Sequence, residues 1–398
     1  MSRALCIGSG QDALRALPAL EELLAGRGPL LLPHSADEPS PTMPQEADLE
    51  GLGLGPQVAA LAVGTSGSTG AAKRAVLPAA ALRASAQATH ERLGGPGRWL
   101  LALPGHHIAG LQVMLRSLGA GQAPAVLPAG PFTAAAFARA ARTMTGGPRY
   151  TSLVPTQLRR VLADEGATGA LSEFDAVLVG GSATPPDLLA AAREAGIRLV
   201  LTYGMSETAG GCVYDGVPLS GVHLALDAGR VLLSGPMLAS GYLGGNTGAF
   251  RRIGGRRWLR TDDIGHLEQG RLAIDGRADD VLITGGLKVW PAQVERVLAP
   301  LLPAGAEVVV VGIPDPEWGS AVVAAIAPLA ATDFDVEGLL HAARRLLPRH
   351  ALPRAMAVLE QLPTTGPGKP DRRRIAESLA QPGALSMPVS ATMRDHHP

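Results

Sequence analysis

Apolar residues recur at two different spacings along the chain as far as residue 205. Segments 11–25 and 78–93 carry apolar residues three and four positions apart, as helices do, whereas the short apolar runs 58–63 and 176–179 end in glycine and polar residues. The other predicted strands are 29–32, 99–103, 123–127, 152–154 and 199–203, and the other predicted helices are 107–119, 132–144, 157–164 and 186–194. Strands and helices that alternate in this way predict a layered α/β fold with a largely parallel sheet.

The pattern changes after residue 215, where short apolar strands follow one another with glycine turns between them. These strands are predicted at 222–226, 230–234, 258–260, 266–268 and 272–274. They indicate a small antiparallel sheet or barrel. Further along, predicted helices at 291–298 and 336–346 are interspersed with predicted strands at 308–312, 321–328 and 357–359. This second arrangement predicts a compact α+β unit.

The change of pattern predicts the domain organisation of the chain. Residues 1–276 are expected to form a large N-terminal domain with layered α/β subdomains and the small β-barrel. Residues 277–380 are expected to form a small α+β C-terminal domain. Residues 381–398 lack periodicity, so we expect a disordered tail there.

Composition excludes several classes of protein. The 35 basic and 35 acidic side chains give no net charge, which argues against nucleic acid as the main partner and against a polybasic membrane anchor. No apolar run approaches the ~18 residues of a membrane span. Cys6 and Cys212 are too few for a disulfide scaffold or a cysteine zinc cluster. With no secretory signal in residues 1–10, we expect a cytoplasmic protein.

Lysine is rare in this chain, because the basic residues are nearly all arginine. Only Lys73, Lys288 and Lys369 are present. Lysine is a compact point charge and arginine a planar fork, so the two do not interchange at a tight site. The three lysines are therefore candidates for positions that require an ammonium group.

A loop rich in hydroxyls and glycine follows the predicted strand 58–63. It contains Thr65, Ser66, Gly67, Ser68, Thr69 and Gly70, with Lys73 three residues later. Backbone N–H groups and hydroxyls of such a loop can bind phosphate oxygens, and a lysine adds charge. The loop lacks the ending of a Walker A sequence, so a solvated loop is the alternative interpretation.

Two further strand ends carry candidate ligands. The first is the run Thr202, Tyr203, Gly204, Met205, Ser206, Glu207. In it the tyrosine face can stack on a base, and the carboxylate can hold Mg²⁺ that also contacts phosphates. The second is Asp263, which can accept hydrogen bonds from ribose hydroxyls. The alternatives are a turn with a surface glutamate and an ordinary Asp-rich turn.

Two glycine-containing segments lie near and beyond the predicted domain boundary. Segment 276–291 contains Arg277, Asp279, Gly285 and Gly286. Segment 362–372 is a glycine-proline loop that presents Lys369. Taken in order, the five segments resemble the adenylate-forming superfamily of acyl-CoA synthetases, adenylation domains and luciferases, over about residues 60–372. The resemblance implies a small mobile C-terminal domain, ATP with Mg²⁺, and an acyl-adenylate intermediate.

The resemblance also implies a role for individual residues. The 65–70 loop and Lys73 would bind the β- and γ-phosphates, Glu207 would bind Mg²⁺, and Lys369 would bridge the substrate carboxylate and the α-phosphate. Gly180, Gly181 and Ser182 would line the adenine pocket together with 202–206, with Tyr203 stacked on adenine. Asp263 and Arg277 would bind ribose, Asp279 would be the hinge, and Gly285 and Gly286 would line the pantetheine tunnel. Asp262 stands where the family usually has glycine.

Three more segments resemble the compact actinobacterial branch of o-succinylbenzoate–CoA ligases, which act in menaquinone biosynthesis. They are 103–111, whose His107 would border the acyl pocket; 154–158; and 207–216, which contains Gly210 and Gly211. This resemblance implies CoA as co-substrate and an aromatic dicarboxylic acid as the acyl donor. His106 and His107 have an alternative interpretation, in which they cap the helix that follows.

Three other functions are alternatives to this ligase. They are another aryl- or acyl-CoA ligase, a stand-alone adenylation enzyme, and a non-catalytic protein that binds an acyl group or nucleotide. Glu207 and Lys369 count against the last, because a binding module needs neither. The expected partners are small molecules, and neither nucleic acid nor a membrane is expected. The sequence leaves the oligomeric state undetermined, with a homodimer as one alternative.

Overall fold

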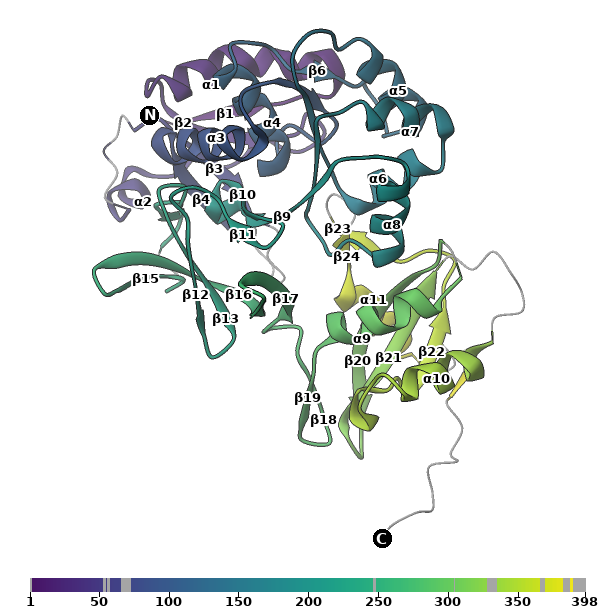
Figure 1. Cartoon of the computed structure of the whole chain (residues 1–398). Coiled ribbons are helices and arrows are strands. Elements are labelled where there is room, and N and C mark those ends of the chain that lie inside the picture. The colour runs from purple at the N-terminus through teal and green to yellow at the C-terminus, as the bar shows by residue number, and fades with distance from the viewer. Residues whose placement is uncertain are drawn as a thin grey trace. The chain divides into compact units, whose positions relative to one another are not determined.

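The computed structural model describes residues 2–52, 55, 58–65, 73–245, 248–303, 305–327, 335–365, 369–381 and 387–388 (Figure 1). The chain forms two compact units. Unit 1 comprises Met1–Thr261 and Leu267–Ala273, and unit 2 comprises Asp262–His266 and Ile274–Pro398. Among the described residues, no helix is long and apolar enough to cross a membrane.

The first sheet of unit 1 carries the loop predicted to bind phosphate. Its strands, in spatial order, are β1 (Ser2–Cys6), β2 (Leu30–His34), β3 (Ala60–Gly64), β4 (Arg74–Pro78) and β14 (Gly241–Tyr242). The first three run parallel, whereas β4 is antiparallel to both β3 and β14. Sequence patterning missed β4. The pairing of β3 with β4 therefore brings the two ends of this loop, Gly64 and Arg74, together.

The second sheet of unit 1 has seven strands and is mostly parallel, as predicted. Its spatial order is β11 (Val217–Pro218), β10 (Gly210–Tyr214), β9 (Leu199–Met205), β8 (Ala176–Val179), β7 (Arg149–Leu153), β5 (Arg98–Leu101) and β6 (Ala125–Val126). The strands from β6 to β9 are parallel, and β10 turns back antiparallel to β9. Strand β8 is wholly buried, which is typical of a parallel sheet covered on both faces.

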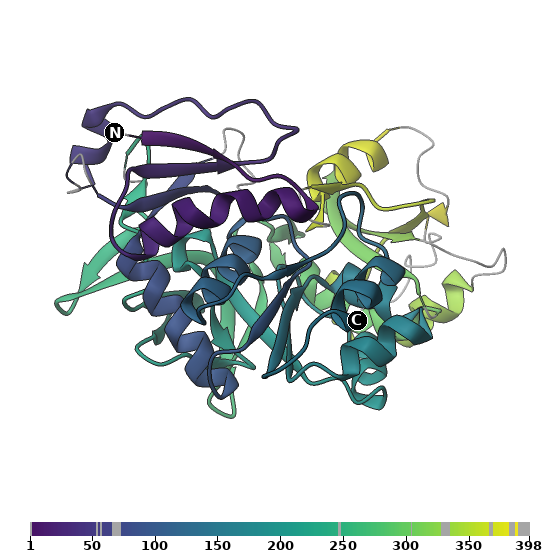
Figure 2. The same cartoon turned by 90° about the horizontal axis from the view of Figure 1, so that it is seen from above.

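Helices cover the sheets of unit 1. They are η1 (Gly10–Ala16), α1 (Leu17–Leu24), α2 (Glu46–Glu50), α3 (Ala79–Leu93), α4 (Ile108–Gly119), α5 (Ala134–Arg142), α6 (Pro155–Leu162), α7 (Glu165–Ser172) and α8 (Pro186–Glu194). Helices α1, α3 and α4 pack against one another and lie side by side in both views (Figures 1 and 2). Helix α7, which patterning missed, packs against α5 and α6.

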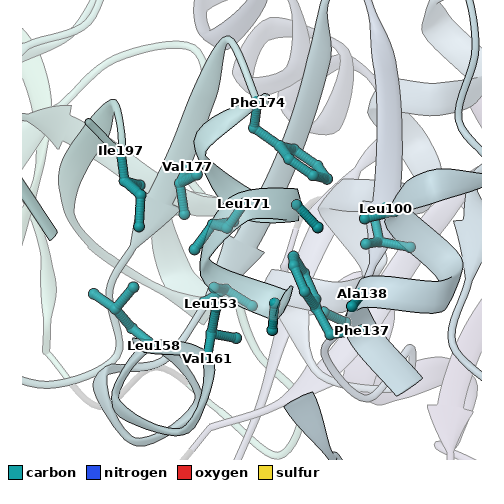
Figure 3. Close-up of a cluster of buried hydrophobic side chains, with 14 of the residues drawn as sticks. Leu100, Phe137, Ala138, Leu153, Leu158, Val161, Leu171, Phe174, Val177 and Ile197 are labelled. Atoms are coloured by element: carbon teal, nitrogen blue, oxygen red, sulfur yellow. The ribbon is translucent and has the colours of Figure 1, made fainter. Parts of the chain in front are cut away.

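A hydrophobic core lies between β5, β7, β8 and the helices α5 to α8 (Figure 3). Its largest side chains are Phe137 and Phe174, which are fully buried with ring centroids 5.9 Å apart. Each fully buried large apolar side chain stabilises the fold by about 1.5–3 kcal/mol. Because aromatic residues are few, the rest of this core is built from leucine, valine, isoleucine and alanine, with Met144.

The third sheet of unit 1 is the one predicted as a small sheet or barrel. It contains β12 (His223–Asp227), β13 (Arg230–Ser234), β15 (Phe250–Ile253), β16 (Arg256–Glu268) and β17 (Arg271–Arg277). The two strands predicted at 258–260 and 266–268 are one continuous strand, β16. Strands β16 and β17 contribute residues to both units.

Unit 2 is built on a sheet in the order β20 (Glu307–Asp315), β21 (Gly319–Ala327), β22 (Ala355–Val358) and β25 (Met387–Pro388). Side chains alternate between its two faces. Val310 and Val322 pack with α9 (Pro291–Leu298) and α10 (Val336–Arg344). Val309 and Val323 pack with α11 (Arg372–Leu379), a helix that patterning missed. Unit 2 also contains two 3-10 helices, η3 (Ala299–Leu301) and η4 (Arg349–Ala351). Two small hairpins are formed by β18 (Leu282–Thr284) with β19 (Leu287–Val289), and by β23 (Thr364–Thr365) with β24 (Lys369–Pro370).

The mixed α/β fold class predicted from the sequence is confirmed. Within the expected tail, Met387 and Pro388 pair with β22 as strand β25. Residues 382–386 and 389–398 lie outside the described residues.

Candidate active site

The predicted phosphate loop begins and ends at a tight hairpin. Gly64 at the end of β3 pairs with Arg74 at the start of β4. The backbone N–H of Thr65 donates to the carbonyl of Lys73 at 2.8 Å. Thr65 and Lys73 are thus neighbours, and Lys73 is exposed. The predicted ligands Ser66, Gly67, Ser68, Thr69 and Gly70 lie outside the described residues.

Glu207 lies in a short turn between β9 and β10. The turn is the 3-10 helix η2 (Ser206–Thr208). Its ends are fixed by the hydroxyl of Thr208, which accepts from the N–H of Met205 at 2.9 Å and donates to the carbonyl of Gly210 at 2.7 Å. Ala209 then adopts a left-handed conformation with φ 51°, which returns the chain into β10. The half-buried carboxylate of Glu207 is therefore held on a rigid turn rather than on a free loop.

Three contacts bring the base of the phosphate loop and the Glu207 turn together. The hydroxyl of Ser206 donates to the carbonyl of Gly64 at 3.0 Å. The hydroxyl of Tyr242 donates to Glu207 Oε1 at 2.7 Å. Lys73 Nζ lies 6.0 Å from the centroid of the Tyr242 ring. Residues from segments far apart in sequence thus form one site in unit 1.

Sequence reasoning missed Tyr242. It lies on β14, a two-residue strand too short to give a hydrophobic pattern. A signal was nevertheless present, because the chain has only four tyrosines. The scarcity argument that singled out the lysines would also have drawn attention to this residue.

The residues predicted for the adenine pocket lie at the adjacent ends of β8 and β9. Val179 pairs with Leu201, which places Gly180 beside Thr202. A Cβ at Gly180 would lie 2.3 Å from Thr202 Oγ1, so only glycine fits without a shift. Gly181 follows with φ +87°, and Ser182 is exposed. Tyr203 is half-buried on β9.

His107 occupies the N-cap position of α4, and its side chain makes no capping hydrogen bond. The alternative interpretation of this histidine as a helix cap is therefore not supported. Its ring lies 4.2 Å from that of His106, centroid to centroid. Burial lowers the pKa of His106, while the charge of Glu38 opposes that shift.

Helix α4 is tied to the segment that follows Glu207. The amide of Gln112 donates to the carbonyl of Ala209 at 2.8 Å, and the hydroxyl of Ser85 donates to the same carbonyl at 3.0 Å. A Cβ at Gly210 would lie 3.4 Å from Gln112 Cγ, and one at Gly211 would lie 3.1 Å from Thr202 Cβ. Helix α4, whose N-cap is His107, therefore packs closely on Gly210, whereas Gly211 packs against Thr202 of β9.

In unit 2, Arg277 lies among the carboxylates predicted for ribose binding and for the hinge. It donates two hydrogen bonds of 2.8 Å to Asp279 and lies 3.8 Å from Asp263 and 3.7 Å from Asp262. Burial alone would lower the pKa of Arg277, but the hydrogen bonds and charges of Asp279, with the charge of Asp263, raise it. The predicted ribose and hinge residues thus form one charged cluster.

Gly285 and Gly286 form the turn of the β18–β19 hairpin, both with positive φ. A Cβ at Gly285 would lie 2.6 Å from Trp318 Cε3, and the N–H of Gly285 donates to the carbonyl of Trp318. The turn is therefore shaped by a tryptophan that sequence reasoning did not single out. The guanidinium of Arg354 lies 4.2 Å from the same ring.

The backbone of Lys369 belongs to β24, opposite Thr365 in β23. Its side chain and residues 366–368 lie outside the described part of the chain. Three residues later, Arg372 donates to Glu295 Oε2 at 2.9 Å and to the carbonyl of Val310 at 2.7 Å. It also lies 3.6 Å from Asp280. These contacts tie the start of α11 to α9 and β20.

The donor set around Glu207 fits a cation that is shared with a substrate. Among the described residues, no group of three or more His, Cys, Asp or Glu side chains could hold a metal ion by itself. Mg²⁺ is usually held by one or two carboxylates, with substrate phosphates and water as the other ligands. Glu207 beside the base of a hydroxyl-rich loop has that chemistry.

Two family models match the chain. The model of AMP-binding enzymes matches residues 34–243, and that of the AMP-binding enzyme C-terminal domain matches residues 293–369. A probable 2-succinylbenzoate–CoA ligase of Mycobacterium tuberculosis H37Rv is 44% identical over 388 residues, which cover 95% of this chain and 98% of that protein.

Two other similar proteins widen the comparison. Indoleacetate–CoA ligase of Aromatoleum aromaticum EbN1 is 30% identical over 357 residues, 82% of this chain and 69% of that protein. The o-succinylbenzoate CoA synthetase of Bacillus subtilis, solved in complex with its acyl-adenylate intermediate, shares the fold with a TM-score of 0.71 and 23% identity, over 94% of this chain and 87% of that one.

These comparisons confirm the resemblance to adenylate-forming enzymes. One family model matches more than half of the chain, and a relative 44% identical aligns with nearly all of it. The chain belongs to the AMP-binding enzyme family.

Proposed function

We propose that this protein ligates CoA to o-succinylbenzoate through an acyl-adenylate, with release of AMP and pyrophosphate. The observation that carries the proposal is the 44% identity to the mycobacterial ligase over almost the full length of both chains. The joined phosphate loop and Glu207 turn support an ATP-dependent reaction. The product would serve menaquinone biosynthesis.

The first half-reaction joins two anions. A carboxylate oxygen of the acid attacks the α-phosphorus of ATP, and the bond to the bridging oxygen of pyrophosphate breaks. Lys73 and the backbone of the 65–70 loop would bind the β- and γ-phosphates, and Lys369 would lie between the carboxylate and the α-phosphate. Positive charge aimed at the reacting phosphate lowers the barrier because it offsets the repulsion.

Glu207 would hold Mg²⁺ in this step. The bound ion would neutralise charge on the phosphate oxygens. Tyr203, Gly180, Gly181, Ser182 and neighbouring residues of β9 would bind adenine, while Asp263 and Arg277 would bind ribose. His107, Gly210 and Gly211 would border the acyl group.

The second half-reaction transfers the acyl group to CoA. The thiolate sulfur attacks the acyl carbon, and the bond from that carbon to the oxygen of AMP breaks. Residues 277–380 would turn about Asp279 between the two steps, which brings Gly285 and Gly286 to the pantetheine arm. A domain rotation of this kind lets one pocket serve two reactions.

The test is pyrophosphate release by the purified chain with Mg-ATP, CoA and a panel of aromatic and aliphatic acids. We expect turnover with o-succinylbenzoate well above every other acid. Absence of AMP above background with that acid would refute the proposal. Omission of CoA separates a ligase from a stand-alone adenylation enzyme. A ligase needs CoA as its acyl acceptor, whereas a stand-alone adenylation enzyme would load a carrier protein instead.

A second candidate function is the ligation of CoA to another aryl acid. The likeness to indoleacetate–CoA ligase favours this candidate, because that relative acts on an aromatic acid with one carboxylate. Turnover with monocarboxylic aryl acids but not with o-succinylbenzoate would select it.

The proposal includes a cytoplasmic location, where ATP and CoA are available, and leaves the monomer and the homodimer as the two assemblies to be distinguished. Light scattering of the purified chain measures its mass in solution. A mass of one chain at micromolar concentration would refute the dimer.

A further inference from the structure

Tyr242 lies next to the phosphate-loop base because β14 pairs with β4. Tyr242 is opposite Ala75, two residues after Lys73. The N–H of Leu243 donates to the carbonyl of Arg74 at 3.0 Å, and the N–H of Ser240 donates to the carbonyl of Val76 at 2.8 Å. The backbone around Tyr242 is thus fixed to the strand that follows the loop.

The hydroxyl of Tyr242 fixes the carboxylate of Glu207. It donates to Glu207 Oε1 at 2.7 Å, a short distance typical of a hydrogen bond to a charged acceptor. The N–H of Ala239, three residues before Tyr242, donates to the Glu207 carbonyl at 2.8 Å. A carboxylate offers about four acceptor positions, so one phenol leaves room for a cation.

The ring of Tyr242 lies beneath the ammonium of Lys73. The 6.0 Å between Nζ and the ring centroid is within the range of a cation–π interaction. The centroid of the Phe250 ring lies 5.7 Å from that of the Tyr242 ring. The Arg257 guanidinium lies 4.2 Å from the Phe250 centroid. With only 7% of its surface exposed, Tyr242 has little freedom to turn away.

We propose that Tyr242 is a positioning residue for the metal–nucleotide site: its hydroxyl orients Glu207 for the metal, and its ring orients Lys73 for the phosphates. One side chain would then couple two ligands that come from different segments of the chain. The inference rests on the proposed roles of Glu207 and Lys73, and it names a residue that acts through both.

The experiment separates the hydroxyl from the ring with two variants of the full chain. Tyr242→Phe keeps the ring and removes the hydroxyl, whereas Tyr242→Leu removes both. The probe is Mn²⁺ in place of Mg²⁺, with ATP and no acid, so that no turnover occurs. Binding is measured by calorimetric titration and by the electron paramagnetic resonance signal of free Mn²⁺.

We expect Tyr242→Phe to weaken Mn²⁺ binding in the presence of ATP by about 10–100-fold, the usual effect of removing a group that orients a metal ligand. Its affinity for ATP in the presence of EDTA should stay near that of the parent protein. Tyr242→Leu should weaken this metal-free ATP binding as well, by roughly two- to fivefold, because Lys73 loses its aromatic support.

Tyr150→Phe is the matched control. This variant also removes a phenol hydroxyl that is part-buried in unit 1, one that donates to the carbonyls of Leu93 and Gly95, each at 3.2 Å. It should lower the melting temperature without a change in Mn²⁺ or ATP affinity. The proposal is overturned if the Tyr242→Phe protein binds Mn²⁺ as tightly as the parent protein does. It is also overturned if Mn²⁺ binding is lost only because the variant unfolds.

The binding readout is independent of the acid. If the parent protein binds Mn²⁺ and ATP but does not activate o-succinylbenzoate, the substrate assignment fails and the role of Tyr242 is still tested. If the parent protein turns over that acid but Tyr242→Phe has an unchanged metal requirement, the role of Tyr242 fails and the function stands.

Discussion

Two carboxylates of the candidate site are each contacted by a side chain from another element of the chain. Glu207 accepts from Tyr242, and Asp263 lies 3.8 Å from Arg277. Tyr242 comes from β14 and Glu207 lies in η2, whereas Arg277 comes from β17 and Asp263 lies on β16. A half-buried charge is costly to leave without its partner. Substitution of Tyr242 or Arg277 should therefore impair the site, although the carboxylates themselves are unchanged.

At the residue scale, the role of Lys369 can be tested by its removal. We expect Lys369→Ala to slow acyl-adenylate formation by about 10²–10³-fold, because the positive charge beside the reacting phosphate is lost. Thioester formation from supplied acyl-adenylate should be nearly unchanged. Pyrophosphate exchange and single-turnover thioester formation measure the two steps separately.

The control for this variant is Lys288→Ala, which removes the exposed lysine of β19. It has the same change of charge in the same unit and should leave adenylation intact. If both half-reactions of Lys369→Ala fell equally, the proposed role of this lysine would be wrong.

His90 gives a prediction about pH. Burial, together with the charge of Arg116, lowers the pKa of His90 to about 4, so the folded protein holds it neutral. The unfolded chain takes up a proton near pH 6.5. Unfolding therefore binds a proton between about pH 4 and 6.5, and stability should fall across this range by up to ~3 kcal/mol as pH decreases.

Urea unfolding at a series of pH values measures this slope. The variant His90→Gln has no titrating ring and should lose the corresponding part of the slope between pH 4 and 6.5. An equal slope in both proteins would show that other groups cause the acid sensitivity.

At the scale of elements, the hairpin of β9 and β10 determines where Glu207 lies. The two strands approach so closely that a Cβ at Gly204 would lie 2.1 Å from the carbonyl oxygen of Gly210. Such a contact is far inside van der Waals distance, and backbone atoms cannot move aside as a side chain can. The glycine thus keeps the Glu207 turn against the end of β3.

We expect Gly204→Ala to destabilise unit 1 by about 1–3 kcal/mol, the usual range for overpacking. It should also weaken ATP binding, because the turn must shift. The matched control is Gly169→Ala in α7, where a Cβ would meet nothing within 4 Å. That variant should be stabilised by about 0.5–1 kcal/mol, since alanine loses less freedom in a helix than glycine. Denaturant unfolding and nucleotide titration measure both effects, and equal stabilities would contradict the prediction.

The elements that sequence patterning found and missed differ in a physical way. Helices 78–93 and 186–194 and strand 176–179 were predicted within one residue, because each buries a full face or is buried on both faces. Strand β14 was missed because two residues carry no period. Helix α11 was missed because its three leading arginines hide the buried Ile375 and Leu379.

At the scale of the whole molecule, the chain passes between its two units through β16 and β17. Residues 262–266 belong with unit 2, residues 267–273 return to unit 1, and the chain then stays in unit 2. Asp263 and Arg277 lie at these crossings, within unit 2, and Asp279 follows directly. The proposed ribose ligands thus adjoin the proposed hinge, so nucleotide binding and rotation should influence each other.

The separation of the half-reactions gives a prediction for unit 2. Gly285→Ala places a Cβ 2.6 Å from the Trp318 ring at a φ of +55°. We expect it to slow thioester formation at least about tenfold by displacing the turn, and to leave pyrophosphate exchange unchanged. The control is Gly305→Ala, which has a positive φ of +88° but open space around the Cβ. If Gly285→Ala slowed both half-reactions while Gly305→Ala slowed neither, the assignment of this turn to CoA would be contradicted.

The sequence by itself determined the family, the α/β class and the order of the motifs, because these depend on local patterns of residues and their spacing. It also drew attention to Lys73 and Lys369 through the scarcity of lysine. Only the tertiary structure decided which motifs meet. Tyr242 contacts Glu207 and lies beside Lys73 because β14 pairs with β4, and strand pairing between distant segments leaves no mark in a local pattern. The contact of Arg277 with Asp263 likewise depends on the pairing of β17 with β16, whereas its contact with Asp279, two residues later, is local.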